Sequence, residues 1–260
     1  MKKILICGLP GSGKTTLAEK LMAIMGNAVW YNADAVRAEA NDWDFSLEGR
    51  LRQATRMRTL CESAPHYAIA DFVCPTQELR KVFAADFVIW MNTLEQSKFE
   101  DTNKIFEPAY FCNIEITEKN WWSEEKAEEW ARRLAVLIKQ HEFDYSKPTT
   151  QMLGRYQPWH KGHRTLFERA LAKHGQVAIM IREMPSTESN PFSYGQIAER
   201  IELDLAAYAG KFRIIPVPNI VNITYGRDVG YAIEKEDLGE DIHRISATSI
   251  RAQMKADGEL

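Results

Sequence analysis

Short apolar runs alternate with longer amphipathic segments through the first half of the chain. The apolar runs predict strands at 4–7, 28–31, 67–73, 87–91 and 112–116. Apolar positions at helical spacing predict helices that begin after Ser46 and after Ser123, both of which are good N-cap residues. This alternation favours an α/β fold, with a parallel sheet and helices on both of its faces.

The helical period breaks after Gln140, and the chain then stays polar until it has passed Pro148. We expect a domain boundary in this stretch, because a chain of 260 residues suits two compact domains better than one. Beyond it, an apolar entry, a glycine turn and a helix follow in order, which again predicts α/β structure. The expected organisation is a first domain at 1–142, a linker at 143–150 and a second domain at 151–260.

Charge and composition narrow the range of partners. The chain has 33 basic and 36 acidic residues and a net charge of −3, which favours small-molecule substrates over nucleic acid. No signal peptide precedes the first strand and the apolar runs are too short for a membrane span, so we expect a cytoplasmic protein without a membrane partner. A homo-oligomer is left open. The cysteines lie far apart, which predicts reduced core thiols rather than a zinc site: Cys7, Cys61, Cys74 and Cys112.

A glycine-rich segment, Gly8-Leu9-Pro10-Gly11-Ser12-Gly13-Lys14-Thr15, connects the first strand to a helix. This is the context of a phosphate-binding P-loop, in which backbone N–H groups and the helix start face an anion. Lys14 is expected to reach the β- and γ-phosphates, and the Thr15 hydroxyl to bind Mg²⁺. The predicted ATP site consists of Gly8, Gly11, Ser12, Gly13, Lys14, Thr15 and Thr16.

An acceptor site is expected beside this loop. Asp34 follows the second strand, at the sheet edge where open α/β folds bind ligands. It is placed to serve as a general base or to orient an acceptor hydroxyl, and the alternative is that it only caps the next helix. Arg37, one helical turn further on, is expected to hold an anionic group of the acceptor. Arg50 and Arg56 either face the same cleft or belong to a solvated helix face, and both interpretations stay open.

The first half resembles adenylylsulfate (APS) kinases in its P-loop, in 32–37, in Phe45-Ser46 with Arg50 and Arg56, and in 72–75. The resemblance implies that Asp34 assists the 3′-hydroxyl of the acceptor and that Arg37 contacts a nucleotide acceptor. The sequence departs from the family pattern at Asn32, Cys74 and Gln77 and from about Asp101 to Pro108. The polar segment 98–108 is expected to be a mobile lid or substrate loop. The resemblance therefore implies a small-molecule kinase and leaves its acceptor open.

The second half carries His160-Lys161-Gly162-His163 at the start of a predicted helix. Two imidazoles separated by a glycine can both donate to one phosphate at a helix N-terminus, and they would stabilise charge that develops on an α-phosphate. The alternatives are a capping histidine with a surface histidine, or a zinc pair, for which no third ligand is evident. Near the C-terminus, Ser246 and Thr248 can open a helix and Arg251 can reach the departing pyrophosphate; a plain capped helix is the alternative.

These two motifs resemble the HxGH and ISxTxxR signatures of the nucleotidyltransferases, and within that superfamily the residues 154–158, 190–193 and 216–219 are similar to short nicotinamide-mononucleotide (NMN) adenylyltransferases. The resemblance implies a Rossmann-like domain in which a substrate phosphate attacks the α-phosphorus of ATP. The segment 225–228 departs from that pattern and resembles a Gly-Arg-Asp segment of ATP sulfurylases. The implied nucleotide site consists of Gly154, Arg155, Tyr156, Gln157, His160, Gly162, His163, Ser246, Thr248 and Arg251.

The sequence therefore predicts a bifunctional transferase with ATP as substrate and Mg²⁺ as cofactor. Lys14, Asp34, His160, His163 and Arg251 are its expected catalytic residues. The first domain would phosphorylate a hydroxyl of a nucleoside-like acceptor. The second would transfer AMP to a phosphorylated small molecule, as in making NAD from NMN. The open alternatives are sulfate activation, a cytidylyltransferase, a nucleotide-sensing regulatory domain, and polynucleotide end repair, against which the balanced charge argues.

Overall fold

A computed structural model describes residues 2–118, 123–224, 226, 232–239, 245–258 and 260. The chain divides into two compact units, Met1–Ala135 and Val136–Leu260, and the division falls within one helix. In the part of the chain that is described, no helix has the length and apolar character needed to span a membrane. The Gly-Arg-Asp segment at 225–228 and the tryptophans at 121 and 122 lie wholly or mostly outside the described residues.

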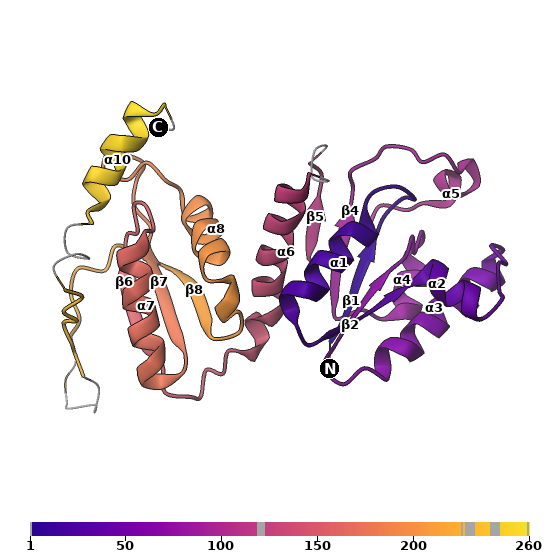
Figure 1. The fold of residues 1–260 in the computed structure, drawn as a ribbon, viewed down its shortest axis with the longest axis horizontal. Helices are drawn as coiled ribbons and strands as arrows, with labels where there is room; N and C mark the ends of the chain where they lie inside the picture. The colour runs from indigo at the N-terminus through magenta and orange to yellow at the C-terminus, as the bar shows by residue number, and fades with distance from the viewer. Residues whose placement is uncertain (1, 119–122, 225, 227–231, 240–244, 259) are drawn as a thin grey trace. The chain divides into compact units, whose positions relative to one another are not determined.

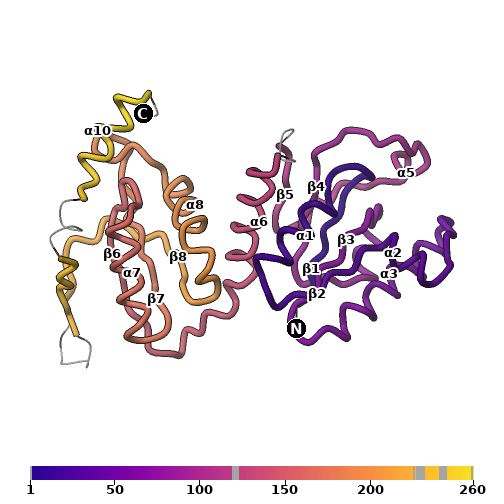
Figure 2. Tube along the Cα trace, in the orientation of Figure 1, coloured from indigo at the N-terminus to yellow at the C-terminus, as the bar shows by residue number. Residues whose placement is uncertain are grey.

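The first unit contains a five-stranded parallel sheet in the order β2-β3-β1-β4-β5 (Figures 1 and 2). Its elements are β1 (Lys2–Cys7), α1 (Lys14–Met25), β2 (Ala28–Asn32), α2 (Ala33–Glu39), α3 (Leu47–Glu62), β3 (Tyr67–Asp71), α4 (Gln77–Phe83), β4 (Phe87–Met91), α5 (Glu100–Ile105), β5 (Ile114–Ile116) and α6 (Glu124–Lys139), which extends into the second unit. The α/β class and the parallel sheet predicted from the sequence are confirmed.

Both faces of this sheet are buried, because side chains of a strand alternate between them. Leu5 and Cys7 pack with residues of α3 and α4 in one apolar cluster. Ile4 and Ile6 point to the opposite face and are also fully buried. In Figure 1, α1 runs along one side of the sheet and α3 and α4 along the other. The near-continuous apolar run of β1 is therefore what a central parallel strand requires.

The polar segment 98–108 was expected to be a loop, and this is wrong in part because it contains the helix α5. Its first turn carries Glu100 and Asp101 and its last turn carries Lys104, so the charges complement the helix dipole. The Asn103 side chain donates to the carbonyl oxygen of Ser97 at 2.8 Å and accepts from its backbone N–H, which fastens the helix to the chain before it. Six residues with this charge order were too short to show a helical apolar stripe.

The second unit contains a three-stranded parallel sheet in the order β6-β7-β8. Its elements are η1 (Gln140–Glu142), β6 (Thr150–Gly154), α7 (Lys161–His174), β7 (Val177–Arg182), α8 (Tyr194–Asp204), η2 (Ala206–Tyr208), β8 (Phe212–Val217) and α10 (Ala247–Ala256). Gln176 is buried, and its side-chain amide donates to the carbonyl of Asp144 at 2.7 Å and to the Thr149 hydroxyl at 2.6 Å. The segment predicted as a linker is thus held against the start of β7.

Only glycine fits at position 49, in the first turn of α3, because Asp44 lies against the place where a side chain would begin. A Cβ at this position would lie 2.3 Å from the Asp44 carbonyl oxygen and 2.5 Å from its Cγ. A Gly→Ala change in a helix usually stabilises by about 0.8–1 kcal/mol, but overpacking costs about 1–3 kcal/mol. We therefore expect Gly49→Ala to lower the free energy of unfolding, measured by urea denaturation followed by circular dichroism.

The matched control is Gly195→Ala in the first turn of α8, where an added Cβ meets nothing within 4 Å. This variant should keep or raise the urea midpoint. Equal stabilisation by both changes would show that the segment before α3 does not pack against Gly49.

Candidate functional site

The P-loop of the first unit closes tightly around its lysine. Gly8 has φ +148°, and a Cβ there would lie 2.6 Å from the carbonyl oxygen of Met91, so only glycine fits. The Lys14 ammonium donates to the Leu9 carbonyl at 2.8 Å. The Thr93 hydroxyl donates to the Ser12 carbonyl at 3.0 Å and ties the loop to the end of β4. The Ser12 hydroxyl itself is buried and has no hydrogen-bond partner among the described residues, as expected of a cradle built for a ligand.

An acidic residue that the sequence interpretation missed completes this loop. The Thr15 hydroxyl donates to the Asp71 carboxylate at 2.8 Å, and the Asn32 amide donates to the same carboxylate at 2.9 Å. Asp71 ends β3, directly beside β1 and β2. The available signal was a carboxylate at the end of the apolar run 67–70, next to the edge that carries the P-loop.

Burial shifts the pKa values of Lys14 and Asp71. Desolvation lowers the pKa of Lys14 to about 8, while Asp71 and Asp34 act in the opposite direction. Desolvation likewise raises the pKa of Asp71, against hydrogen bonds from its neighbours, the first of which is Thr15. A neighbouring charge of opposite sign would therefore stabilise the charged form of each group. A bound phosphate would do this for Lys14, and a bound cation for Asp71.

The donor set fits Mg²⁺ bound together with phosphates. The cluster offers the Thr15 hydroxyl and the Asp71 carboxylate, which are hard oxygen ligands. Among the described residues no group of three or more His, Cys, Asp and Glu side chains could hold a metal ion by itself. Mg²⁺ is usually held by one or two protein ligands plus substrate phosphates and water, so the set is suited to that cation.

A cavity of about 600 Å³ opens beside Lys14 and Thr15. Of the residues predicted for the acceptor, Asp34, Arg37 and Arg50 line it, and Arg56 does not. Asp34 does not cap α2, because the Asn32 side chain accepts from the N–H groups of Asp34 and Ala35 instead. The apolar part of the lining includes Trp43, Phe45 and Phe99.

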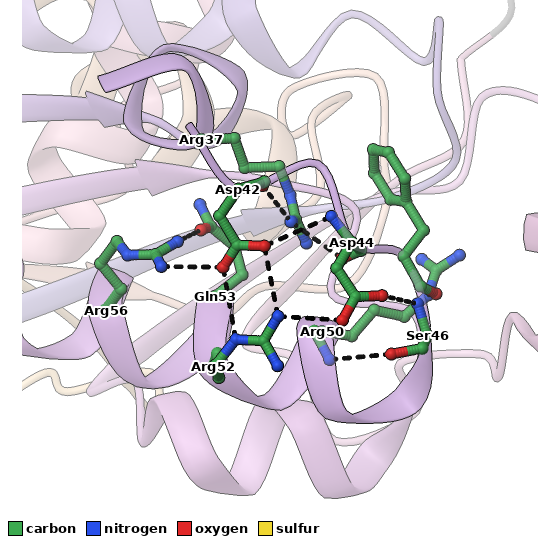
Figure 3. A network of polar contacts seen from close by, with 10 residues as sticks. Arg37, Asp42, Asp44, Ser46, Arg50, Arg52, Gln53 and Arg56 are labelled. Atoms are coloured by element: carbon green, nitrogen blue, oxygen red, sulfur yellow. Dashed lines mark hydrogen bonds and ion pairs between the residues drawn. The ribbon is translucent and has the colours of Figure 1, made fainter. Parts of the chain in front are cut away.

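Four arginines are already engaged by the segment between α2 and α3 (Figure 3): Arg37, Arg50, Arg52 and Arg56. The buried Arg37 guanidinium donates to the carbonyls of Asp42 and Asp44 at 2.9 and 3.0 Å. Arg56 forms an ion pair with Asp42 at 2.9 Å, and Arg52 pairs with Asp42 and Asp44. Hydrogen bonds from Arg56 and then Arg52 hold the pKa of Asp42 far below its usual range. This network fixes the segment that carries Trp43 and Phe45.

A second cavity, of about 420 Å³, is lined by the P-loop residue Leu9 and by residues that follow β4. Trp90 and Tyr110 contribute its aromatic lining, with ring centroids 6.2 Å apart. The Asn92 amide donates to the Glu115 carboxylate at 2.7 Å on its wall. The cavity therefore combines flat apolar surfaces with a few hydrogen-bonding groups.

In the second unit, His160 and His163 lie stacked with ring centroids 3.8 Å apart. His160 is the N-cap of α7, and its Nδ1 accepts from the Gly162 N–H at 3.1 Å. His163 also stacks on Trp159 at 5.4 Å, and its Nδ1 is buried without a partner among the described residues. The alternative of a capping histidine with an unrelated surface histidine therefore fits His160 only.

The other residues predicted for this site surround the same helix start. Tyr156 packs edge-on against His163 at 5.0 Å and covers Gly154. The Gln157 side chain donates to the Phe192 carbonyl at 2.8 Å, and Arg155 reaches the Asn190 amide oxygen at 3.4 Å.

The C-terminal helix α10 meets this loop. Ser246 caps the helix by accepting from the Ser249 N–H at 3.0 Å. Arg251 donates to the carbonyl of Gln157 and lies 3.3 Å from the Thr248 hydroxyl. The motif at 246–251 is thus joined, through one arginine, to the loop that leads into the motif at 160–163.

No protein-family model matches the sequence, and no curated protein matches it. Among solved structures, a shikimate kinase from Acinetobacter baumannii in complex with shikimate is 19% identical, with a TM-score of 0.42 over 55% of this chain and 96% of that chain. A sugar kinase from a Janibacter species is 16% identical, with a TM-score of 0.40 over 50% and 92%. A chain of the Pnkp1/Rnl/Hen1 RNA repair complex is 13% identical, with a TM-score of 0.29 over 98% and 85%. TM-scores this low carry no argument about activity.

The buried position of His163 predicts a pH dependence of stability. Burial, and then the nearby His160, lower the pKa of His163 to about 3. Above pH 6.5 the histidine is neutral in both folded and unfolded chains. As the pH falls from 6.5 towards 3, His163 binds a proton in the unfolded chain but not in the folded chain, so the free energy of unfolding falls.

His163→Gln should therefore lose less stability than the wild type between pH 7 and pH 4.5, by about 2–3 kcal/mol in urea unfolding. His174→Gln, at the other end of α7, is the matched control. If His163→Gln and the wild type lose stability in parallel, the ring is not held neutral by its surroundings.

Proposed function

We propose that the first unit is an ATP-dependent small-molecule kinase. The observation that carries this proposal is the meeting of Lys14, Thr15 and Asp71 at one end of the sheet, beside a cavity large enough for an acceptor. The glycine cradle would hold the β- and γ-phosphates, with Lys14 neutralising their charge. Thr15 and Asp71 would hold Mg²⁺, which would supply positive charge beside the phosphates.

The acceptor in this proposal is nucleoside-like. Asp34 lines the cavity and acts on the charge of Lys14, so a hydroxyl near Asp34 would face the terminal phosphate. The hydroxyl oxygen forms a bond to the γ-phosphorus, its proton passes to Asp34, and the bond to the β,γ-bridging oxygen breaks to release ADP. Phe45 and Phe99 would pack against a flat ring of the acceptor. The second cavity, with Trp90 and Tyr110, would take the adenine of ATP.

We propose that the second unit transfers a nucleotidyl group, most simply AMP. The support is the stacked pair His160 and His163 at a helix N-terminus, together with Arg251 of α10, which donates to the Gln157 carbonyl in the loop before that helix. A phosphate oxygen of the acceptor would attack the α-phosphorus of ATP, and pyrophosphate would leave with the electrons of the broken bond. Neutral imidazoles each keep one N–H, so they would serve as hydrogen-bond donors to the developing charge.

Incubation with ATP labelled in turn at its α- and γ-phosphorus separates the two proposed activities. A kinase moves the γ label to the acceptor, whereas a transferase moves the α label. NMN and sulfate are the first acceptors to test for the transferase, and nicotinamide riboside and APS for the kinase. NAD formed from NMN would support the first substrate pair, and APS formed from sulfate would support sulfate activation.

Lys14→Ala should lower γ-phosphoryl transfer on the order of 10²–10³-fold, because one preorganised cation is lost from the developing charge. Lys20→Gln, two turns along the same helix, is the matched control and should keep the rate. Asp71→Asn should raise the Mg²⁺ concentration needed for half-maximal rate. A sensor without turnover would instead show lost ATP binding in Lys14→Ala with no change in any phosphorylation rate.

His163→Ala should lower the turnover of nucleotidyl transfer far more than it weakens ATP binding, since its N–H is needed most in the transition state. One lost donor of this kind costs about 2.7–4 kcal/mol of activation free energy. Turnover is measured with α-labelled ATP, and binding by calorimetry. Equal losses in turnover and binding would argue for ground-state binding alone.

A further inference from the structure

Arg182, the last residue of β7, has a guanidinium that the fold of the second unit does not fully use. One of its terminal nitrogens, Nη1, donates to the carbonyl oxygen of Ile220 at 3.2 Å and reaches the Asn219 side chain at 3.5 Å. Its Nε is buried and has no hydrogen-bond partner among the described residues. A buried N–H without a hydrogen-bond partner costs about 1–3 kcal/mol. A bound ligand that accepts from the Nε of Arg182, at the carboxyl end of β7, would remove this cost.

The charge of Arg182 is also uncompensated within the described part of the unit. Its recorded partners are a carbonyl and an amide, with no carboxylate at ion-pair distance. By contrast, Arg164 and Lys173 on α7 both pair with carboxylates. A guanidinium that is half-buried, fixed by a backbone carbonyl and free of acidic partners is suited to a bound anion.

The position of Arg182 relates it to the histidine pair. Gly154 at the end of β6 pairs with Ile181 in register, so Arg182 lies at the same carboxyl edge from which the chain runs to His160. Figure 1 shows β7 between β6 and β8. The α10 helix reaches the loops after both β6 and β7, through Arg251 to the Gln157 carbonyl and Lys255 to Glu188.

One proposed anion position lies at the histidine pair after β6, and the other lies at Arg182 at the end of β7, one strand further along the sheet. His160, His163 and Arg251 gather at the loop after β6, whereas Arg182 is on the next strand and holds the loop after β8. Neighbouring strands lie roughly 4.8 Å apart. Two phosphates held along one edge at about this spacing need only a small approach to reach reacting distance, which is about 3–3.5 Å between reacting atoms.

We infer that Arg182 binds the anionic phosphate of the acceptor, next to the α-phosphate of the nucleotide at the histidine pair. This inference rests on the transferase activity proposed above and names the residue that selects a phosphorylated acceptor. The guanidinium would donate from Nε and a terminal nitrogen to two phosphate oxygens, which leaves a third oxygen to attack. An acceptor without a phosphate would leave the Nε unpaired and bind weakly.

Inorganic phosphate is the probe for this site. All proteins carry Lys14→Ala, which removes phosphate binding at the P-loop, and contain a saturating non-hydrolysable ATP analogue to occupy the histidine pair. Calorimetry should then detect one phosphate per chain. Arg182→Gln should weaken phosphate binding by about tenfold or more, because a charge-assisted bidentate contact is lost. Arg182→Lys should retain part of it.

The matched control is Arg213→Gln. Arg213 is on β8 and pairs in register with Ala178, near the opposite end of the sheet, and it donates to the Gln140 side chain at 2.9 Å. This variant should bind phosphate as the parent does, and circular dichroism melting would show that each variant is folded. No phosphate binding in the parent, or equal binding in the parent and Arg182→Gln, would overturn the inference.

The labelled-ATP assay distinguishes failure of the inference about Arg182 from failure of the transferase proposal. Phosphate binding that depends on Arg182, without transfer of the α label to any acceptor, would leave an anion site on a chain that is not a transferase. Transfer that proceeds in Arg182→Gln with an unchanged KM for the acceptor would leave the transferase and remove Arg182 from its substrate site.

Discussion

The Asp71 carboxylate accepts hydrogen bonds from Thr15 and Asn32, and the first of these contacts joins residues 56 positions apart. It exists because β1, β2 and β3 run parallel and in register, with Asn32 directly opposite Asp71. A slip of one residue in β3 would turn this carboxylate to the other face of the sheet. The register of three buried strands therefore decides whether the phosphate loop has an acidic partner at all.

The strands, the glycine loop and the serine caps could be predicted because each depends on residues close together in sequence. Ser46 caps α3 as its position before an apolar stripe indicates. Asp71 was missed because its importance comes from a neighbouring strand and not from its own segment. The short helix α5 was missed because six residues carry too little periodicity, although their charges are ordered along it. The roles assigned to the individual site residues stay predictions.

The arginines of α2 and α3 show why residue type alone left their roles open. Arg37, Arg50 and Arg56 have the same charge and lie within a short stretch, yet each meets a different environment. Arg37 is buried against two carbonyls, Arg50 donates to the Phe45 carbonyl and pairs with Asp101, and Arg56 pairs with Asp42. The deciding factor is the path of the segment 40–46, which brings Asp42 and Asp44 to Arg52 and Arg56 (Figure 3). That path follows from side-chain contacts that no local pattern encodes.

The stacked imidazoles of His160 and His163 would link anion binding in the second unit to proton uptake. Two rings at 3.8 Å repel one another strongly if both are charged, so the first proton that this pair binds disfavours a second. A polyanion that settles against them would pull that proton from solution. The heat of such an association would then vary with the ionisation enthalpy of the buffer, and calorimetry in two buffers would count the protons taken up.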